Sequence, residues 1–172
     1  MEYYDLIRKR YSVRSYSDKK VESVKLSQIL EAARIAPTGC NRQPFKIIVC
    51  DMPESLQKVQ SAANLYGAPL ALIVCAETDK AWVRPYDGKN IAEIDAGIVT
   101  TQMMLEAVNQ GLGSVWICHF NPETLRSEFK LPANLEPVNI LAVGYASGEA
   151  PSANRFETQR KKISELVFYN RL

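Results

Sequence analysis

The chain has 172 residues, of which 47% are hydrophobic and 23% are charged, and its formal net charge is +2. This length suffices for the core of one domain, spanning residues 1–172, and is short for two. A net charge this close to zero does not by itself favour nucleic acid or an anionic membrane as a partner. No apolar run is long enough for a signal peptide or a membrane span. We therefore expect a cytoplasmic protein.

The cysteines are scattered along the chain, at Cys40, Cys50, Cys75 and Cys118, without a CxxC pair, and His119 is the single histidine. This spacing argues against both a zinc site and a disulfide framework. We expect reduced, mostly buried cysteines and no metal.

In the first half of the chain, apolar residues recur at helical spacing over residues 24–36, and Pro37 ends that run. Two short β-branched runs, residues 45–50 and 70–76, follow prolines and predict strands buried on at least one face. Further helices are expected over residues 1–10 and 54–65.

In the second half, residues 78–90 have no periodicity and predict a long loop. Residues 91–113 are apolar nearly all round, which predicts a helix in a central layer or at a dimer interface. Strands are expected over 114–118 and 138–146, with a helix capped by Asn121 between them. Four strands alternating with helices indicate an α/β or α+β protein.

Neither GxGxxG nor GxxxxGK[ST] follows a predicted strand, so side chains would have to hold any bound phosphate. The stretch "RKRYSVRSY", residues 8–16, interleaves arginines with Ser and Tyr, and a second basic cluster covers residues 160–162. The planar guanidinium of arginine can donate two parallel hydrogen bonds to phosphate oxygens. Taken singly, each cluster is also compatible with a solvated charged face.

The turn "APTGCNRQPF", residues 36–45, is dense in small, hydroxyl and amide groups that let backbone approach a flat ligand. Together with the basic stretch before it, this turn resembles the signature of the nitroreductase family of FMN-dependent oxidoreductases. Thr38 and Phe45 stand where the family commonly has Ser and Trp. The resemblance continues through residues 82–120 and into the tail.

The resemblance implies an α+β fold in which a mixed, mostly antiparallel sheet of four or five strands surrounds a long central helix. It also implies an interlocked homodimer that exchanges residues 147–172 between subunits. By the same resemblance, Arg10 and Ser12 hold the FMN phosphate and ribityl end, and Tyr11 contributes backbone. Arg14 lies near the flavin N1–O2 edge, where a cation would stabilise the charge of the reduced flavin.

Other positions follow from the resemblance alone. The residues implied to pack on the flavin from the other subunit are Pro37, Thr38, Gly39, Asn41 and Gln43. Those implied beside the ring are Asn64, Trp116, Ile117, Cys118 and His119. The implied C-terminal phosphate ligands are Arg160 and Lys161. We expect His119 and Cys118 to line the pocket rather than to act as acid or nucleophile.

The implied activity is transfer of hydride from NADH or NADPH, through FMN, to an electron-poor acceptor such as a nitroaromatic compound or a quinone, with ping-pong kinetics. The alternatives are a non-catalytic FMN store or sensor, and a related reductive chemistry such as dehalogenation. The loop at 78–90 could cover the substrate; its lid candidates are Trp82, Arg84, Tyr86 and Lys89. A nucleic-acid module is disfavoured, because no aromatic and basic stripe follows a strand.

Overall fold

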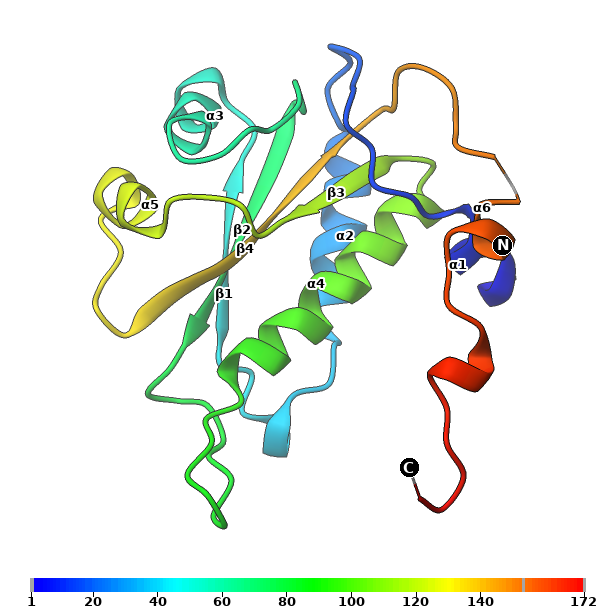
Figure 1. The fold of residues 1–172 in the computed structure, drawn as a ribbon. Helices are drawn as coiled ribbons and strands as arrows, with labels where there is room; N and C mark the ends of the chain where they lie inside the picture. Colours follow the sequence, from blue (N-terminus) through cyan, green and yellow to red (C-terminus); the bar gives the residue numbers. More distant parts are fainter. Residues whose placement is uncertain (1, 153, 172) are drawn as a thin grey trace.

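The computed structural model describes residues 2–152 and 154–171, which form one four-stranded sheet with helices on both faces (Figure 1). The strands are β1 (Phe45–Cys50), β2 (Leu70–Glu77), β3 (Gly113–Ile117) and β4 (Leu135–Gly144), in the spatial order β1-β2-β4-β3. The α-helices are α1 (Tyr3–Lys9), α2 (Ser23–Arg34), α3 (Pro53–Gln60), α4 (Ala92–Asn109), α5 (Pro122–Phe129) and α6 (Arg155–Thr158), with single 3-10 turns η1 (Gly39–Asn41) and η2 (Ile163–Glu165).

The three pairings between neighbouring strands are all antiparallel. Within the described residues, the single parallel pairing is an isolated bridge between Ser12 and Ser114. The predicted α+β class is therefore confirmed, with four strands in the chain.

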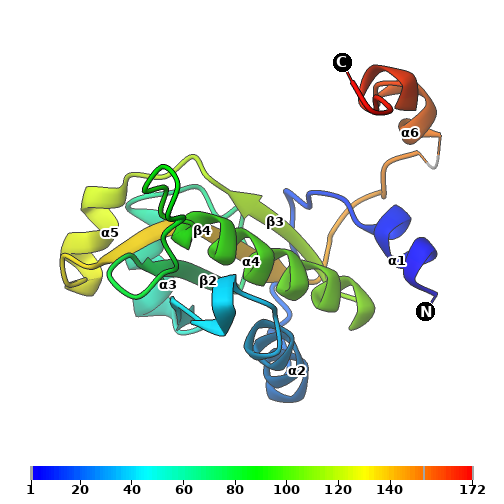
Figure 2. The same cartoon turned by 90° about the horizontal axis from the view of Figure 1, so that it is seen from below.

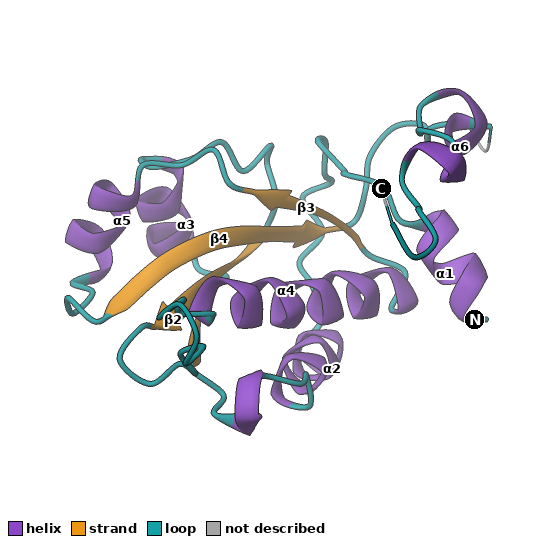
Figure 3. Cartoon of the chain, turned by 60° about the horizontal axis from the view of Figure 1, so that its bottom comes forward, coloured by secondary structure: helices purple, strands orange, loops and turns teal. Residues whose placement is uncertain are grey.

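The sheet separates two apolar cores because side chains alternate across a strand. Leu72 and Val74 of β2 face α2 and α4, whereas Ile73 and Cys75 face α3 and α5. All eight residues of β2 are buried, as expected for a strand covered on both faces. Figure 3 shows the two helical layers on either side of the sheet.

The helix α4 lies along the sheet beside α2, and one of its faces is buried in the single chain. Met103 and Val108 are buried, whereas Ile94 is 49% exposed and Ile98 and Leu105 are only partly covered. The expected apolar helix is therefore present, but this chain alone does not enclose it. Its outer face is suited to contact with a second molecule.

Some boundaries differ from the sequence expectations. The helix α3 ends at Gln60, where a turn begins, and β4 begins at Leu135 rather than at residue 138. The segment 78–90 is a small hairpin instead of an open loop, because Val83 and Asn90 form an isolated bridge.

The C-terminal tail, from α6 onward, stands clear of the sheet (Figures 1 and 2). Its apolar side chains are exposed: Ile163, Leu166, Val167, Phe168 and Tyr169. Exposed apolar side chains in such a group favour contact with another surface. The exchange of residues 147–172 between subunits stays a prediction, and residues 153 and 172 of that segment lie outside the described residues.

We predict that two Gly-to-Ala substitutions differ in their effect on the free energy of unfolding. A Cβ at Gly113 would lie 2.5 Å from Val13 Cγ2, so Gly113→Ala should lower the free energy of unfolding by about 1–3 kcal/mol. A Cβ at Gly97 in α4 meets only Trp116, at 3.7 Å, so Gly97→Ala should be neutral or stabilising by up to about 1 kcal/mol. Urea unfolding at one protein concentration measures both. Equal effects would contradict the close approach at Gly113.

Candidate functional site

Backbone hydrogen bonds fix the N-terminal basic stretch to the ends of β3 and β4. The Val13 N–H donates to the Ser114 carbonyl at 3.0 Å, and the Ser17 N–H donates to the Tyr145 carbonyl at 2.9 Å. The absence of a side chain at Gly113 lets Val13 approach β3 closely. Between these anchors Arg14 is exposed, so its guanidinium is presented at the sheet edge rather than buried in the fold.

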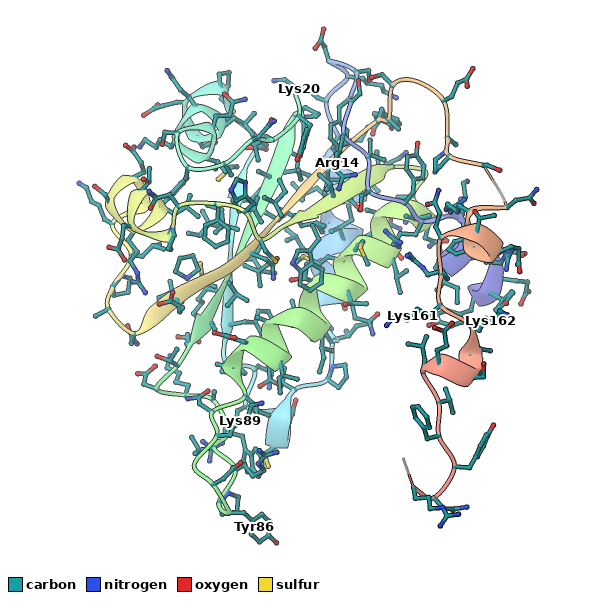
Figure 4. The ribbon with its side chains drawn as sticks, in the orientation of Figure 1. Arg14, Lys20, Tyr86, Lys89, Lys161 and Lys162 are labelled. Atoms are coloured by element: carbon teal, nitrogen blue, oxygen red, sulfur yellow. The ribbon has the colours of Figure 1, made fainter. Side chains whose placement is uncertain are left out.

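The Arg14 guanidinium lies 6.0 Å from the centre of the Tyr66 ring. Asn64 accepts a hydrogen bond from the Tyr66 N–H at 2.8 Å, which orders this turn after α3. Asn64 and His119 line an open hollow of about 730 Å³ between the end of α3 and the start of α5. Asn64 and His119 thus come from separate segments that meet at this hollow, and Arg14 lies beside Tyr66. Figure 4 places Arg14 near the top of the molecule.

The strand β3 is an edge strand, so its outer side offers backbone groups that the sheet does not use. Trp116 lies over α4 at Gly97, and its indole N–H donates to Cys118 Sγ at 3.1 Å. Ile117 points into the opposite core and is buried. Its predicted contact with a cofactor could therefore come only from its backbone.

A cationic cluster forms where the tail meets α1. Arg155 donates to the carbonyls of Arg8 and Arg10, and its guanidinium lies 4.2 Å from the centre of the Phe156 ring. The guanidinium groups of Arg8 and Arg160 lie 5.1 and 6.0 Å from the same ring. The structure therefore brings Arg10 and Arg160 together, although 150 residues separate them in the sequence.

Within residues 2–152 and 154–171, no acidic side chain forms an ion pair with this cluster. Burial, and then the nearby charges of Arg160 and Arg155, lower the pKa of Arg10 below its ordinary value. Among the ion pairs of the described residues, none involves Arg8, Arg10, Arg155 or Arg160. A phosphate group would relieve the mutual repulsion of these cations, so the residues fit an anionic ligand. Lys161 follows on the tail, beside Lys162 (Figure 4).

The turn at 36–43 is held at the other end of α4. The Gly39 N–H donates to Asp95 Oδ1 at 2.9 Å, and the Gln43 N–H donates to Thr38 Oγ1 at 2.9 Å. A Cβ at Gly39 would lie 2.4 Å from Ile91 Cδ1 and 3.2 Å from Trp82 Cβ, so a side chain there would displace that of Ile91.

The backbone of this turn is strained in places. Cys40, Asn41 and Gln43 have φ values of 48°, 53° and 51°, in the left-handed region that non-glycine residues seldom adopt. The side chain of Gln43 donates to the Asn41 carbonyl at 2.9 Å, and Pro37 is exposed. Strain of this kind persists only where surrounding contacts impose it, and it is common at ligand sites.

The lid candidates lie partly at the base and partly at the tip of the 78–90 hairpin. Trp82 is half-buried and packs against Gly39, whereas Arg84 is tied to Asp87 by an ion pair within the hairpin. Tyr86 is 93% exposed, and Figure 4 shows Tyr86 and Lys89 at the lower end of the molecule, far from Arg14.

The two groups of predicted site residues do not meet in one chain. The basic stretch packs beside Gly113, just beyond the C-terminal end of α4, whereas the 36–43 turn contacts its first turn at Asp95. The 18 residues of α4 span about 27 Å. The two groups therefore lie near opposite ends of α4 within this chain.

Sequence reasoning missed several residues of these groups. Asp95 is a buried carboxylate in α4, and its place in the first turn was the available signal. Arg155 and Phe156 precede the basic run at 160–162, but their contact with residues 8–10 depends on how the tail folds back. Tyr66 carried no signal that distinguished it from a core aromatic residue.

The expectation of mostly buried cysteines is right for two of four: Cys50 and Cys75 are buried, and Cys40 and Cys118 are exposed, all as free thiols. In residues 2–152 and 154–171, no three His, Cys, Asp or Glu side chains gather as metal ligands. Over the same ranges, no helix combines the length and apolarity needed to cross a membrane.

Comparison with known proteins gives concordant results. The model of the Nitroreductase family matches residues 7–64 and 54–145. The crystal structure of a nitroreductase family protein from Clostridium difficile 630 is 52% identical, with a TM-score of 0.98 and 100% of both chains covered. An FMN-dependent nitroreductase from Clostridium difficile R20291 is 27% identical, with a TM-score of 0.81, covering 97% of this chain and 98% of that one. The FMN reductase (NAD(P)H) of Bacillus subtilis strain 168 is 28% identical over 84% of this chain and 66% of its own length.

Thiol reactivity should divide the cysteines into two classes. Burial raises the pKa of Cys50 to about 11 and that of Cys75 to about 12, so the reactive thiolate is scarce in both at pH 8. We expect both to stay unmodified by an aromatic disulfide reagent in the native protein and to react in denaturant. Peptide mapping identifies the modified sites, and modification of Cys75 in the native protein would contradict the prediction.

Proposed function

The chain belongs to the nitroreductase family, and on that premise we propose that it is a homodimeric oxidoreductase that binds FMN and takes hydride from NADH or NADPH. Two similar proteins carry names that specify FMN, and one of those names also specifies NAD(P)H. The observation that carries the proposal is the cationic cluster around Arg10, whose charge the described part of the chain does not balance.

In this proposal the cluster binds the FMN phosphate. Arg10 and Arg160 would donate hydrogen bonds to its oxygens, with Ser12 and Lys161 beside them. Each charge-assisted bond contributes roughly 1.5–3 kcal/mol, so two or three such bonds suffice to anchor the cofactor without covalent attachment. Arg155 supports the cluster by binding the carbonyls of residues 8 and 10.

Bound FMN would supply the two-electron chemistry that connects the nicotinamide donor to the final acceptor. Arg14, exposed at the sheet edge, would place its positive charge at the flavin N1–O2 edge and favour the reduced state. The outer edge of β3 from Trp116 to Cys118 would offer backbone groups to the ring. His119 and Asn64 would line the space beside it.

The partner chain would supply the other wall of this site. Its turn at 36–43 would pack on the flavin, and its hairpin could bring Tyr86 and Lys89 over the substrate. The half-covered outer face of α4 and the apolar tail beyond residue 162 favour such an assembly, because both leave apolar side chains exposed in the single chain. We propose that, of residues 147–172, the apolar part beyond residue 162 packs on the partner subunit, whereas Arg155 and Arg160 stay beside the basic stretch of their own chain.

One open face of the ring would serve both substrates, so NAD(P)+ must leave after the hydride transfer and before the acceptor enters, which gives ping-pong kinetics. We propose an electron-poor acceptor such as a nitroaromatic compound or a quinone. Solvent can supply the protons that such acceptors require, so the reaction needs no side-chain acid.

The absorption spectrum tests this function directly. We expect purified protein, reconstituted with FMN where needed, to show the two visible flavin bands and to lose them when NADH or NADPH is added without oxygen. A flavin spectrum that neither donor bleaches would indicate a storage or sensor protein. Failure to bind FMN at all would refute the proposal.

Replacement of the two arginines should have separable effects. Loss of one phosphate bond in Arg10→Ala should raise the Kd for FMN roughly 10- to 150-fold. Arg14→Ala should retain FMN but lower its midpoint potential by roughly 30–60 mV, the equivalent of about 1.4–3 kcal/mol for two electrons.

Fluorescence titration and anaerobic spectroelectrochemistry measure these quantities. Arg34→Ala is the matched control, because Arg34 lies on α2 and pairs with Glu31, outside the proposed site. An unchanged potential in Arg14→Ala would remove the role assigned to that residue.

A further inference from the structure

Asp95 is a buried carboxylate whose partner lies in the turn at 36–43. The residue is 1% exposed in the first turn of α4, and its Oδ1 accepts the Gly39 N–H at 2.9 Å. Its Oδ2 is also buried and has no hydrogen-bond partner among the described residues. One carboxylate oxygen is thus committed to the turn, and the other is desolvated without compensation.

Burying the Asp95 carboxylate in this way lowers the stability of the fold. The other buried carboxylate of the described chain, Glu77, is 7% exposed and pairs with Lys80 and Lys46. Asp95 has no such cation, and the positive end of the α4 dipole offsets only part of the cost of burying its charge. A less costly residue would serve if packing were the single requirement at this position.

The hydrogen bond acts on a turn that needs external support. A side chain at Gly39 would displace that of Ile91, and the two residues after it, Cys40 and Asn41, both have a left-handed backbone. Among the described residues, other elements of the chain hold this turn through several hydrogen bonds. The one that the Gly39 N–H donates to Asp95 involves the backbone of Gly39 itself, where the strained segment begins. The bond therefore controls the direction in which the backbone of residues 39–41 points.

We propose that Asp95 is a positioning residue: its carboxylate holds the turn at Gly39 in the shape that this turn presents to FMN bound by the partner subunit. The inference rests on the proposed function, because the turn lies at the end of α4 opposite its own Arg10 and Arg14. Asp95 does not touch the cofactor in this assignment; it acts through Gly39.

Three variants test the assignment. Asp95→Ala removes the acceptor, Asp95→Asn keeps an oxygen that can accept the Gly39 N–H, and Glu93→Ala removes an exposed carboxylate from the same helical turn. We expect the Kd for FMN to rise at least tenfold in Asp95→Ala, to change less than threefold in Asp95→Asn and to stay unchanged in Glu93→Ala.

Hydrogen exchange reports on the turn without any cofactor. In the FMN-free protein, Asp95→Ala should speed exchange in the peptide that contains Gly39, and Asp95→Asn should restore its protection. Peptides from β2 should exchange at the wild-type rate in both variants. Faster exchange throughout the sheet would mean that Asp95 serves general stability, and would overturn the positioning role.

Mixed dimers determine which site the turn serves. A dimer of one Asp95→Ala chain and one Arg10→Ala chain contains one site in which both the arginine and the turn are intact, if the turn acts on the partner's FMN. Such dimers, purified with two different tags, should bind one FMN with wild-type affinity. If the turn acts on its own chain's site, no intact site remains, and loss of tight binding would overturn the inference.

The proposed function and the role of Asp95 can be refuted separately. A wild-type protein that does not bind FMN would refute the proposed function. A wild-type protein that binds FMN, together with an Asp95→Ala variant of equal affinity, would refute the role of Asp95 and leave the proposed function intact.

Discussion

The helix α4 sets the distance on which the rest of the structure depends. Its buried face packs on the sheet and on α2, so its two ends cannot move toward each other. One end carries Asp95 and the 36–43 turn, and the other lies beside Val13 and the basic stretch. Within one chain, α4 therefore keeps these two groups apart.

Electrostatic repulsion is a second constraint, and it acts where the tail meets α1. The guanidinium groups around Phe156 repel one another, and burial lowers the pKa of Arg10 further. Hydrogen bonds from Arg155 to backbone carbonyls hold the cluster together despite that repulsion. Because these cations form no ion pairs among the described residues, the fold gains stability when an anion binds, so ligand affinity and the order of the tail are coupled.

The helices and strands could be predicted from the sequence better than the contacts between them. Apolar periodicity over residues 24–36 and 91–113 and the β-branched runs before Cys50 and Glu77 identify most of the sheet and its covering helices, because burial dictates these patterns locally. The side-chain chemistry of residues 8–16 suggests a phosphate site, which stays a prediction. The hydrogen bond that the Gly39 N–H donates to Asp95 and the stacking at Phe156 could not be predicted, because each joins segments whose approach depends on the completed fold.

The two outer strands of the sheet differ in how their free edges are covered. On β1, Lys46 is exposed and reaches Glu77 of the neighbouring strand, and a charged residue at this position discourages pairing with foreign strands. On β3, the N-terminal stretch covers the start of the edge through the bridge from Ser12 to Ser114. Residues that present cations to a ligand thus also guard the sheet against aggregation, so damage to the N-terminal segment would threaten solubility together with binding.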